Sequence, residues 1–157
     1  EQGLYDNSII IITSDHGEEF YEYGTYGHNN AFNRSQAQVP FIVRWPKGGH
    51  KDIHTMTSHL DMVPTLLKYL GVKTAPEKYS MGKNLLSKSI NRDYIFVGNW
   101  NNNAMVTASH TYVFNNSNFF ESNVYSTDSY QKVNEPNNGE MQKIIIKVLE
   151  ENSRFIK

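Results

Sequence analysis

The sequence contains no cysteine, which excludes disulfide bonds and zinc sites built from thiolates. Any metal ion that the chain binds must therefore be held by histidine, carboxylates, hydroxyl groups or water. A strong excess of one charge is also missing, since the formal net charge is only -1. We therefore expect no nucleic-acid partner, because the chain has no positive field that would attract one.

Long hydrophobic runs are absent as well. No apolar stretch approaches the roughly 20 residues of a membrane-spanning helix, and no signal peptide is recognisable. Residues 1–7 are typical of the end of a helix and a following turn, so we expect the chain to begin inside a larger domain. Hydrophobic residues still make up 38% of the 157 residues, which is enough for a folded core.

The sequence pattern divides the chain into two parts, residues 1–90 and 91–157. In the first part, the β-branched run at 8–14 predicts a strand buried on both faces of a parallel sheet. A long ordered loop with one helical turn should follow. Further strands are expected at 39–46, between two prolines, and at 53–57.

An amphipathic helix is predicted over residues 58–70. Asp61 is the expected N-cap, and Gly71 is the expected stop. His59 and Asp61 are interpreted as residues that orient the start of this helix. The apolar residues that recur on one face are Leu60, Val63, Leu66, Leu67 and Leu70.

The second part predicts an antiparallel meander closed by a helix. Asn and Ser clusters separate four strand-like runs, at 94–98, 104–108, 111–115 and 119–125. A turn is expected at 134–139 and an amphipathic helix at 140–155, with Ile144, Ile145, Val148 and Leu149 facing inward. Together the two parts indicate an α/β fold with an antiparallel extension.

Asp15 and His16 are the leading candidate metal ligands. They directly follow the predicted strand at 8–14, and ligands of open α/β sheets bind beyond the carboxyl ends of strands. A carboxylate beside an imidazole suits Zn²⁺ or Mn²⁺. Gly17 would let the strand break, so that both side chains can face one ion. The competing interpretation is that Asp15 only begins a turn.

Other candidate groups carry a weaker signal. His28, by its pattern alone, is a loop histidine. Glu18 and Glu19 are interpreted as surface groups or as groups that support a ligand, and Arg44 is assigned a structural role. The sequence has neither a Gly-rich phosphate loop nor a Gly-x-Ser-x-Gly elbow, so no nucleophile is assigned.

Four segments in series resemble the alkaline phosphatase/sulfatase superfamily. They are Ser-Asp-His-Gly-Glu at 14–18, Tyr-Gly-His at 26–28, the Val-Pro strand at 38–43 and the Asp-x-x-Pro-Thr-Leu-Leu helix at 58–67. Each is weak alone, but their order over residues 8–71 is specific. Residues 79–86, 112–118 and 150–156 are similar to the end of YejM-like inner-membrane proteins of Gram-negative bacteria.

The resemblance implies that the whole chain is the C-terminal portion of a sulfatase-like sandwich with a meander and a closing helix. Asp15 and His16 would bind a divalent ion (Zn, Mn, Mg or Ca), and His28 would be a second ligand or a base at the substrate site. The family's Thr, Ser or modified Cys nucleophile lies upstream and is not in this chain. The isolated chain should therefore be inactive and bind metal weakly or not at all.

The implied activity is hydrolysis of a sulfuric or phosphoric ester, or phosphoethanolamine-type transfer, in the periplasm at the inner membrane. The substrate would be a lipid or another anionic ester, and the membrane anchor would lie elsewhere in the protein. The alternative is a non-catalytic lipid-binding or regulatory module on the same fold. A third interpretation is an unrelated α/β domain. An exposed sheet edge would also allow two copies to form a homodimer.

Overall fold

The computed structural model describes residues 3–118, 121–134 and 138–154. The chain forms two compact units, Glu1–Ile53 and His54–Lys157, whereas the sequence pattern placed the internal division near residue 90. The buried Asp61 joins residues on both sides of the linker after helix α2 (Met62–Tyr69). Its carboxylate binds the amide of Lys83 and the side chain of Arg92, which ties residues 58–92 to one another.

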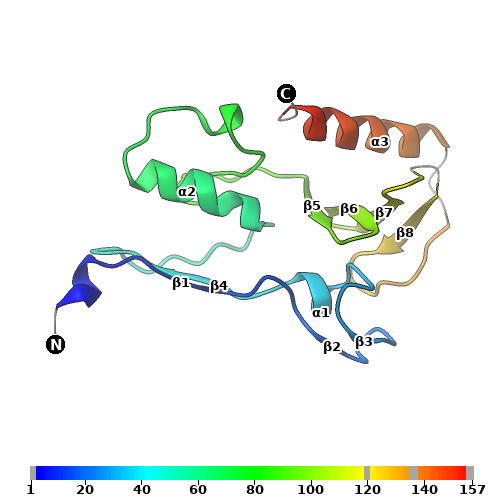
Figure 1. Cartoon of the computed structure of the whole chain (residues 1–157), viewed down its shortest axis with the longest axis horizontal. Coiled ribbons are helices and arrows are strands. Elements are labelled where there is room, and N and C mark those ends of the chain that lie inside the picture. The colour runs from blue at the N-terminus through cyan, green and yellow to red at the C-terminus, as the bar shows by residue number, and fades with distance from the viewer. Residues whose placement is uncertain (1–2, 119–120, 135–137, 155–157) are drawn as a thin grey trace. The chain divides into compact units, whose positions relative to one another are not determined.

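The first unit is built on two paired strands, β1 (Ile10–Thr13) and β4 (Phe41–Arg44), which lie side by side in Figure 1. The turn η1 (Leu4–Asn7) precedes β1. The connection between the two strands contains a short hairpin, β2 (Glu19–Phe20) and β3 (Tyr26–Gly27), and the one-turn helix α1 (Arg34–Ala37). The expected long loop with one helical turn is thus confirmed, with the hairpin as an addition.

The expectation that residues 8–14 form a strand buried in a parallel sheet is wrong. β1 pairs antiparallel with β4, which is its only strand partner among the described residues. Ile12 and its cross-strand neighbour Ile42 are 56% and 58% exposed. The β-branched residues therefore show the local preference of a strand without the burial that usually accompanies it.

The predicted helix at 58–70 forms as the turn η2 (His59–Asp61) followed by α2 (Met62–Tyr69). Asp61 is the N-cap residue of α2, as expected, but its side chain makes no cap bond to that helix. It instead completes a capping box with Ser58, the N-cap of η2, by accepting from the Ser58 amide. Gly71 ends the helix with a φ of 90°, as expected. Part of the predicted apolar face is exposed, namely Leu60, Val63 and Leu70.

The predicted strand at 53–57 is not formed, since these residues are irregular and pair with no strand in the described chain. An isolated extended segment lacks the ladder of backbone hydrogen bonds that a strand requires. The linker after α2 contains the short 3-10 turn η3 (Pro76–Lys78) and a turn closed by the amide of Ser87, which donates to the carbonyl of Asn84.

The meander in the second unit is confirmed. Its strands are β5 (Tyr94–Gly98), β6 (Asn102–Thr107), β7 (His110–Asn115) and β8 (Ser122–Ser126), paired antiparallel in that order. The closing helix α3 (Asn138–Ser153) lies along this sheet in Figure 1. The core consists of Met105, Tyr112, Phe114, Val124 and Val148.

Helix α3 turns most of its predicted face toward this core. Ile144 and Ile145 pack against the core, and Val148 is part of it. Leu149 is exposed instead, at the edge of the face that Val148 centres. Three predictions extend beyond the described residues: the beginning of the strand at 119–125, the turn at 134–139 and the end of the helix at 155.

Candidate metal centre

The site begins with a tight turn directly after β1. The hydroxyl of Ser14 donates to the carbonyl of His16 at 2.7 Å, which closes the turn. The amide of Gly17 donates to the carbonyl of Gln36 at 2.8 Å. A Cβ at Gly17 would lie 2.0 Å from the carbonyl oxygen of Ser35, so only glycine allows this close approach to α1. The backbone on either side of Gly17 is thereby fixed.

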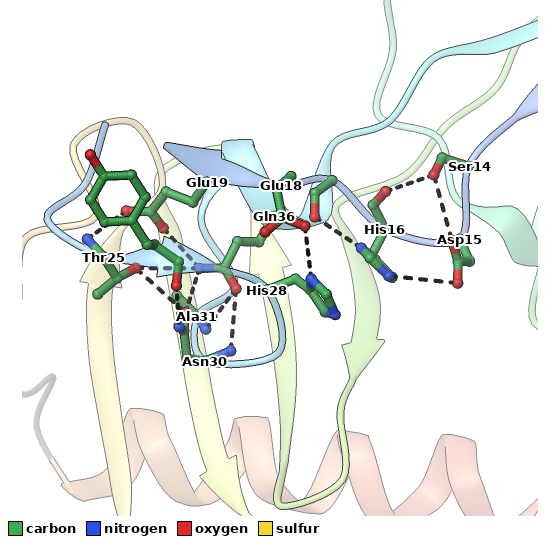
Figure 2. A network of polar contacts seen from close by, with 12 residues as sticks. Ser14, Asp15, His16, Glu18, Glu19, Thr25, His28, Asn30, Ala31 and Gln36 are labelled. Atoms are coloured by element: carbon green, nitrogen blue, oxygen red, sulfur yellow. Dashed lines mark hydrogen bonds and ion pairs between the residues drawn. The ribbon is translucent and has the colours of Figure 1, made fainter. Parts of the chain in front are cut away.

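The β2–β3 hairpin brings His28 to the same place. Glu19 pairs with Gly27, so His28 follows directly after β3 and lies beside Glu18. Nδ1 of His28 is 2.8 Å from Oε2 of Glu18. The rings of His16 and His28 stack with their centroids 4.0 Å apart and 22° between their planes (Figure 2). His16 and His28, twelve residues apart in the loop, therefore lie in one cluster with Glu18.

His16, Glu18 and His28 each offer one ligand atom, and the three atoms lie within 4.8 Å of one another. No other such group of three or more occurs among the residues that the structure describes. The side chains of both histidines are 39% exposed and that of Glu18 is 43% exposed, so the cluster is open to a small ion. Two imidazoles and one carboxylate are a donor set that suits Zn²⁺ or Mn²⁺.

The contacts of His16 favour one tautomer. Its Nδ1 lies 3.0 Å from the carbonyl oxygen of Gly17, an arrangement in which Nδ1 carries the proton. Nε2 then keeps its lone pair, which is the form that binds a metal. Nε2 lies 3.7 Å from Oδ2 of Asp15.

Asp15 stands beside the cluster rather than within it. Its side chain is 88% exposed, and its carboxylate is not one of the three converging groups. Its own backbone amide and then the neighbouring His16 lower the pKa of Asp15, so the side chain is a carboxylate at neutral pH. Among the residues singled out from the sequence, the structure thus brings His16 and His28 together, leaves Asp15 adjacent and adds Glu18.

The sequence pattern leaves Glu19 as a surface group or a group that supports a ligand, and the structure excludes the surface position. Glu19 is 0% exposed, although it lies in a loop rich in polar residues. Burial alone would raise the pKa of Glu19, but hydrogen bonds from Asn33, Gln36 and Thr25 prevail and lower it from 4.5 to about 2. The only sequence signal is the presence of amide side chains more than ten residues downstream, which no local pattern connects to Glu19.

Arg44 has a structural role, as predicted. Its guanidinium lies 4.0 Å from the centre of the Tyr5 ring and donates to the carbonyls of Tyr5 and Ser8. These contacts hold the turn before β1 against β4. The Arg44 side chain therefore stabilises the first unit through contacts with Tyr5 and Ser8.

Comparisons with known proteins agree on one family. The sulfatase family model matches residues 1–72. The inner membrane protein YejM of Salmonella typhimurium is 27% identical over 159 residues, which cover 99% of this chain and 25% of that protein. Lipoteichoic acid synthase 1 of Bacillus subtilis is 34% identical over 130 residues, which cover 73% of this chain and 18% of that protein. The chain thus spans about a quarter of the length of the YejM relative.

A solved structure supports the same fold. A crystal structure assigned to the sulfatases, from Bacteroides thetaiotaomicron, superposes with a TM-score of 0.63 at 18% identity. The superposition covers 99% of this chain and 37% of that one. The strands, the meander and the closing helix therefore occur together in a known architecture.

Proposed function

Since the chain belongs to the alkaline phosphatase/sulfatase superfamily, we propose that it forms part of a metal-dependent site acting on a sulfuric or phosphoric ester. The reaction is hydrolysis, or phosphoryl transfer of the phosphoethanolamine type. The observation that carries this proposal is the convergence of His16, Glu18 and His28 directly beyond β1. Two imidazoles and a carboxylate within reach of one another form a donor set that can hold a divalent ion.

The proposed metal ligands are His16 and Asp15, with Glu18 as a further donor within reach. Imidazole nitrogen favours Zn²⁺ or Mn²⁺ over Mg²⁺ and Ca²⁺, which prefer oxygen ligands. A bound divalent ion would polarise the ester and lower the pKa of a nucleophile. His16 is already held by Gly17 with Nε2 available, so it needs no rearrangement to bind.

His28 is proposed to act as a base at the substrate site or as a second ligand. An imidazole binds a metal in the plane of its ring, so two stacked rings cannot both bind one ion until one of them tilts. In the observed position, Glu18 accepts the Nδ1 proton of His28 and leaves Nε2 with a lone pair. That nitrogen can take a proton from an attacking hydroxyl or water.

The nucleophile is proposed to come from a part of the protein outside these residues. Ser14 is the hydroxyl residue that borders the cluster, and its proton is donated to the carbonyl of His16. This contact suits a structural role. The YejM relative is about four times as long as the chain, which leaves room for the nucleophile and for further acidic ligands. The chain alone should therefore be inactive.

We propose that the protein acts at the periplasmic face of the inner membrane, on a lipid or another anionic ester. The support is similarity to a protein named for the inner membrane and to a lipoteichoic acid synthase. Within the described ranges, no helix has both the length and the hydropathy needed to cross a bilayer. The membrane anchor is thus assigned to another part of the protein.

Calorimetry with Zn²⁺ and Mn²⁺ tests this function, on the chain and on a longer form that contains the upstream segment. Asp15→Ala and His16→Ala should each abolish stoichiometric binding in the longer form, where binding should be much tighter than in the chain. The longer form should then hydrolyse an aryl sulfate or aryl phosphate, and both variants should lose this activity. Metal binding that neither substitution changes would contradict the proposal.

A non-catalytic lipid-binding or regulatory module is the second candidate. The position of Asp15 favours it, because this carboxylate is almost fully exposed and takes no part in the three-residue cluster. If this candidate is correct, the longer form will bind anionic lipid vesicles equally well with and without His16→Ala, and it will not hydrolyse either ester.

A further inference from the structure

Glu19 is a buried carboxylate in an otherwise exposed hairpin. Its neighbours Phe20 and Tyr21 are largely exposed, whereas the Glu19 side chain has no contact with solvent. An ionised group in such a position is destabilising unless hydrogen bonds replace the lost water. The bonds that replace it show which parts of the chain Glu19 holds together.

Four donors surround this carboxylate. Oε1 accepts from the amides of Tyr23 at 3.0 Å and Thr25 at 2.9 Å. Oε2 accepts from the side-chain amides of Asn33 at 2.6 Å and Gln36 at 2.8 Å. Oε1 thus binds the turn of the hairpin and Oε2 binds the residues around α1, as Figure 2 shows for Thr25 and Gln36.

Gln36 extends the same network to the other side of His28. Its side-chain Oε1 accepts from the amides of Asn30 at 3.2 Å and Ala31 at 3.1 Å. Its main-chain carbonyl accepts from the amide of Gly17. Gln36 is itself buried, and no buried side-chain nitrogen or oxygen in the described residues lacks a partner. The pair Glu19–Gln36 therefore contacts the loop before His28, the loop after it and the turn that carries His16.

We infer that Glu19, acting together with Gln36, is a positioning residue that holds Glu18 and His28 against His16. The inference rests on the function proposed above, because it assigns a purpose to the same cluster. Thr25 and Asn30 are fixed on the two sides of His28, and Glu18 lies directly before Glu19, the first residue of β2. Without the central carboxylate, the amides of Tyr23 and Thr25 lose their acceptor and the loop is released.

The competing explanation is that Glu19 only stabilises the first unit. The two explanations differ in what happens to the histidine rings when the unit remains folded. A positioning role predicts that the rings separate and that metal binding weakens. A purely stabilising role predicts a lower stability with the cluster unchanged.

Glu19→Gln is the test substitution, because glutamine keeps the shape of the side chain but turns an NH₂ group toward existing donors. Glu22→Gln is its control, since Glu22 lies in the same hairpin, is exposed and undergoes the same change of charge. Folding of the unit is followed by the nuclear Overhauser contact between Ile11 and Val43, which are opposite each other in β1 and β4.

Two readouts are measured on the chain. The first is the Overhauser contact between the rings of His16 and His28 without metal. The second is Co²⁺ affinity, followed by visible absorption. Glu19→Gln should lose the ring contact and bind Co²⁺ about 10–100-fold more weakly, as expected when a group that orients a ligand is removed. Glu22→Gln should change neither. A preserved ring contact in Glu19→Gln would overturn the inference, whatever happens to the metal.

The double variant Glu19→Gln with Gln36→Glu decides the outcome if the single variant does not fold. This variant exchanges the two partners of the hydrogen bond between positions 19 and 36. The carboxylate at position 36 still accepts from the amides of Asn30 and Ala31, and it also accepts from the glutamine side chain at position 19. Recovery of the ring contact supports the inference, and failure to recover it overturns the inference. If the unaltered chain binds no Co²⁺, the ring contact alone tests the role of Glu19, and the metal site is tested by the longer form.

Discussion

The adjacent residues Glu18 and Glu19 have opposite environments. Glu18 is partly exposed and contacts His28, whereas Glu19 is fully buried among four donors. Glu19 begins β2 and Glu18 directly precedes it. Neighbouring side chains of an extended backbone point to opposite faces, which explains the difference. Glu18 is therefore available to a ligand, and Glu19 is available only to the protein.

The buried Glu19 predicts a pH-dependent stability. Its pKa is about 2 in the folded chain, below its usual 4.5, so folding favours the charged form. The stabilisation is complete above pH 4.5 and is lost as the pH falls from there toward 2. Urea unfolding of the first unit at pH 7, 4 and 3 should show this decline. Glu19→Gln should flatten it, and an equal decline in the variant would contradict the assignment.

Asp61 is the corresponding buried carboxylate in the second unit. It pairs with the Arg92 guanidinium, also buried, and accepts from the amides of Ser58 and Lys83. Asp61→Ala leaves a buried cation unpaired and should cost about 3–5 kcal/mol in the free energy of unfolding. Asp93→Ala, at an exposed neighbouring position, should stay within about 0.5 kcal/mol. Denaturant unfolding of both variants checks the difference, and equal losses would refute the buried-pair explanation.

At the scale of elements, the turn at residues 14–17 can contact α1 only because Gly17 has no side chain. Gly17→Ala would place a methyl group 2.0 Å from the carbonyl oxygen of Ser35, so the turn or α1 must move. Overpacking of this kind costs about 1–3 kcal/mol. The variant should also bind Zn²⁺ more weakly, because His16 moves with the turn.

Gly49→Ala is the matched control, because a Cβ there meets nothing within 4 Å. Its unfolding free energy and Zn²⁺ affinity should equal those of the unaltered chain. If the two glycine variants behave alike, the close approach at Gly17 has no role in the site.

Sequence patterns were sufficient for the elements whose partners are close in the chain. The meander, the capped helix α2 and most of the inward face of α3 follow from local periodicity. Pairing and burial of β1 did not follow, because Ile9–Ile12 specifies an extended backbone but not what lies beside it. The same limit applies to the cluster. The motif indicates His16 and His28, whereas the role of Glu19 depends on Asn33 and Gln36, which are 14 and 17 residues away.

At the scale of the whole molecule, the β1–β4 pair has an exposed apolar surface. Ile12 and Ile42 are directly opposite each other, and both are more than half exposed. Within the described ranges, β1 and β4 pair only with each other, so each has an edge without a strand partner. Such edges pair readily with another chain. We therefore predict concentration-dependent self-association of the chain through these strands.

Charge placed on this surface tests the prediction by sedimentation. Ile12→Lys with Ile42→Lys should give monomers over the range in which the unaltered chain associates. Leu86→Lys, an exposed apolar position in the second unit, is the control and should leave association unchanged. Association that survives the double lysine variant would place the contact elsewhere.

The most direct test of the proposed metal centre is a Zn²⁺ titration followed through the ring resonances of all six histidines. We predict that the signals of His16 and His28 change together and follow one binding curve as Zn²⁺ is added. The signals of His50, His54, His59 and His110 should stay in place, since none of these belongs to the cluster. Independent changes of His16 and His28, or changes at the other four histidines with these two unmoved, would contradict the account.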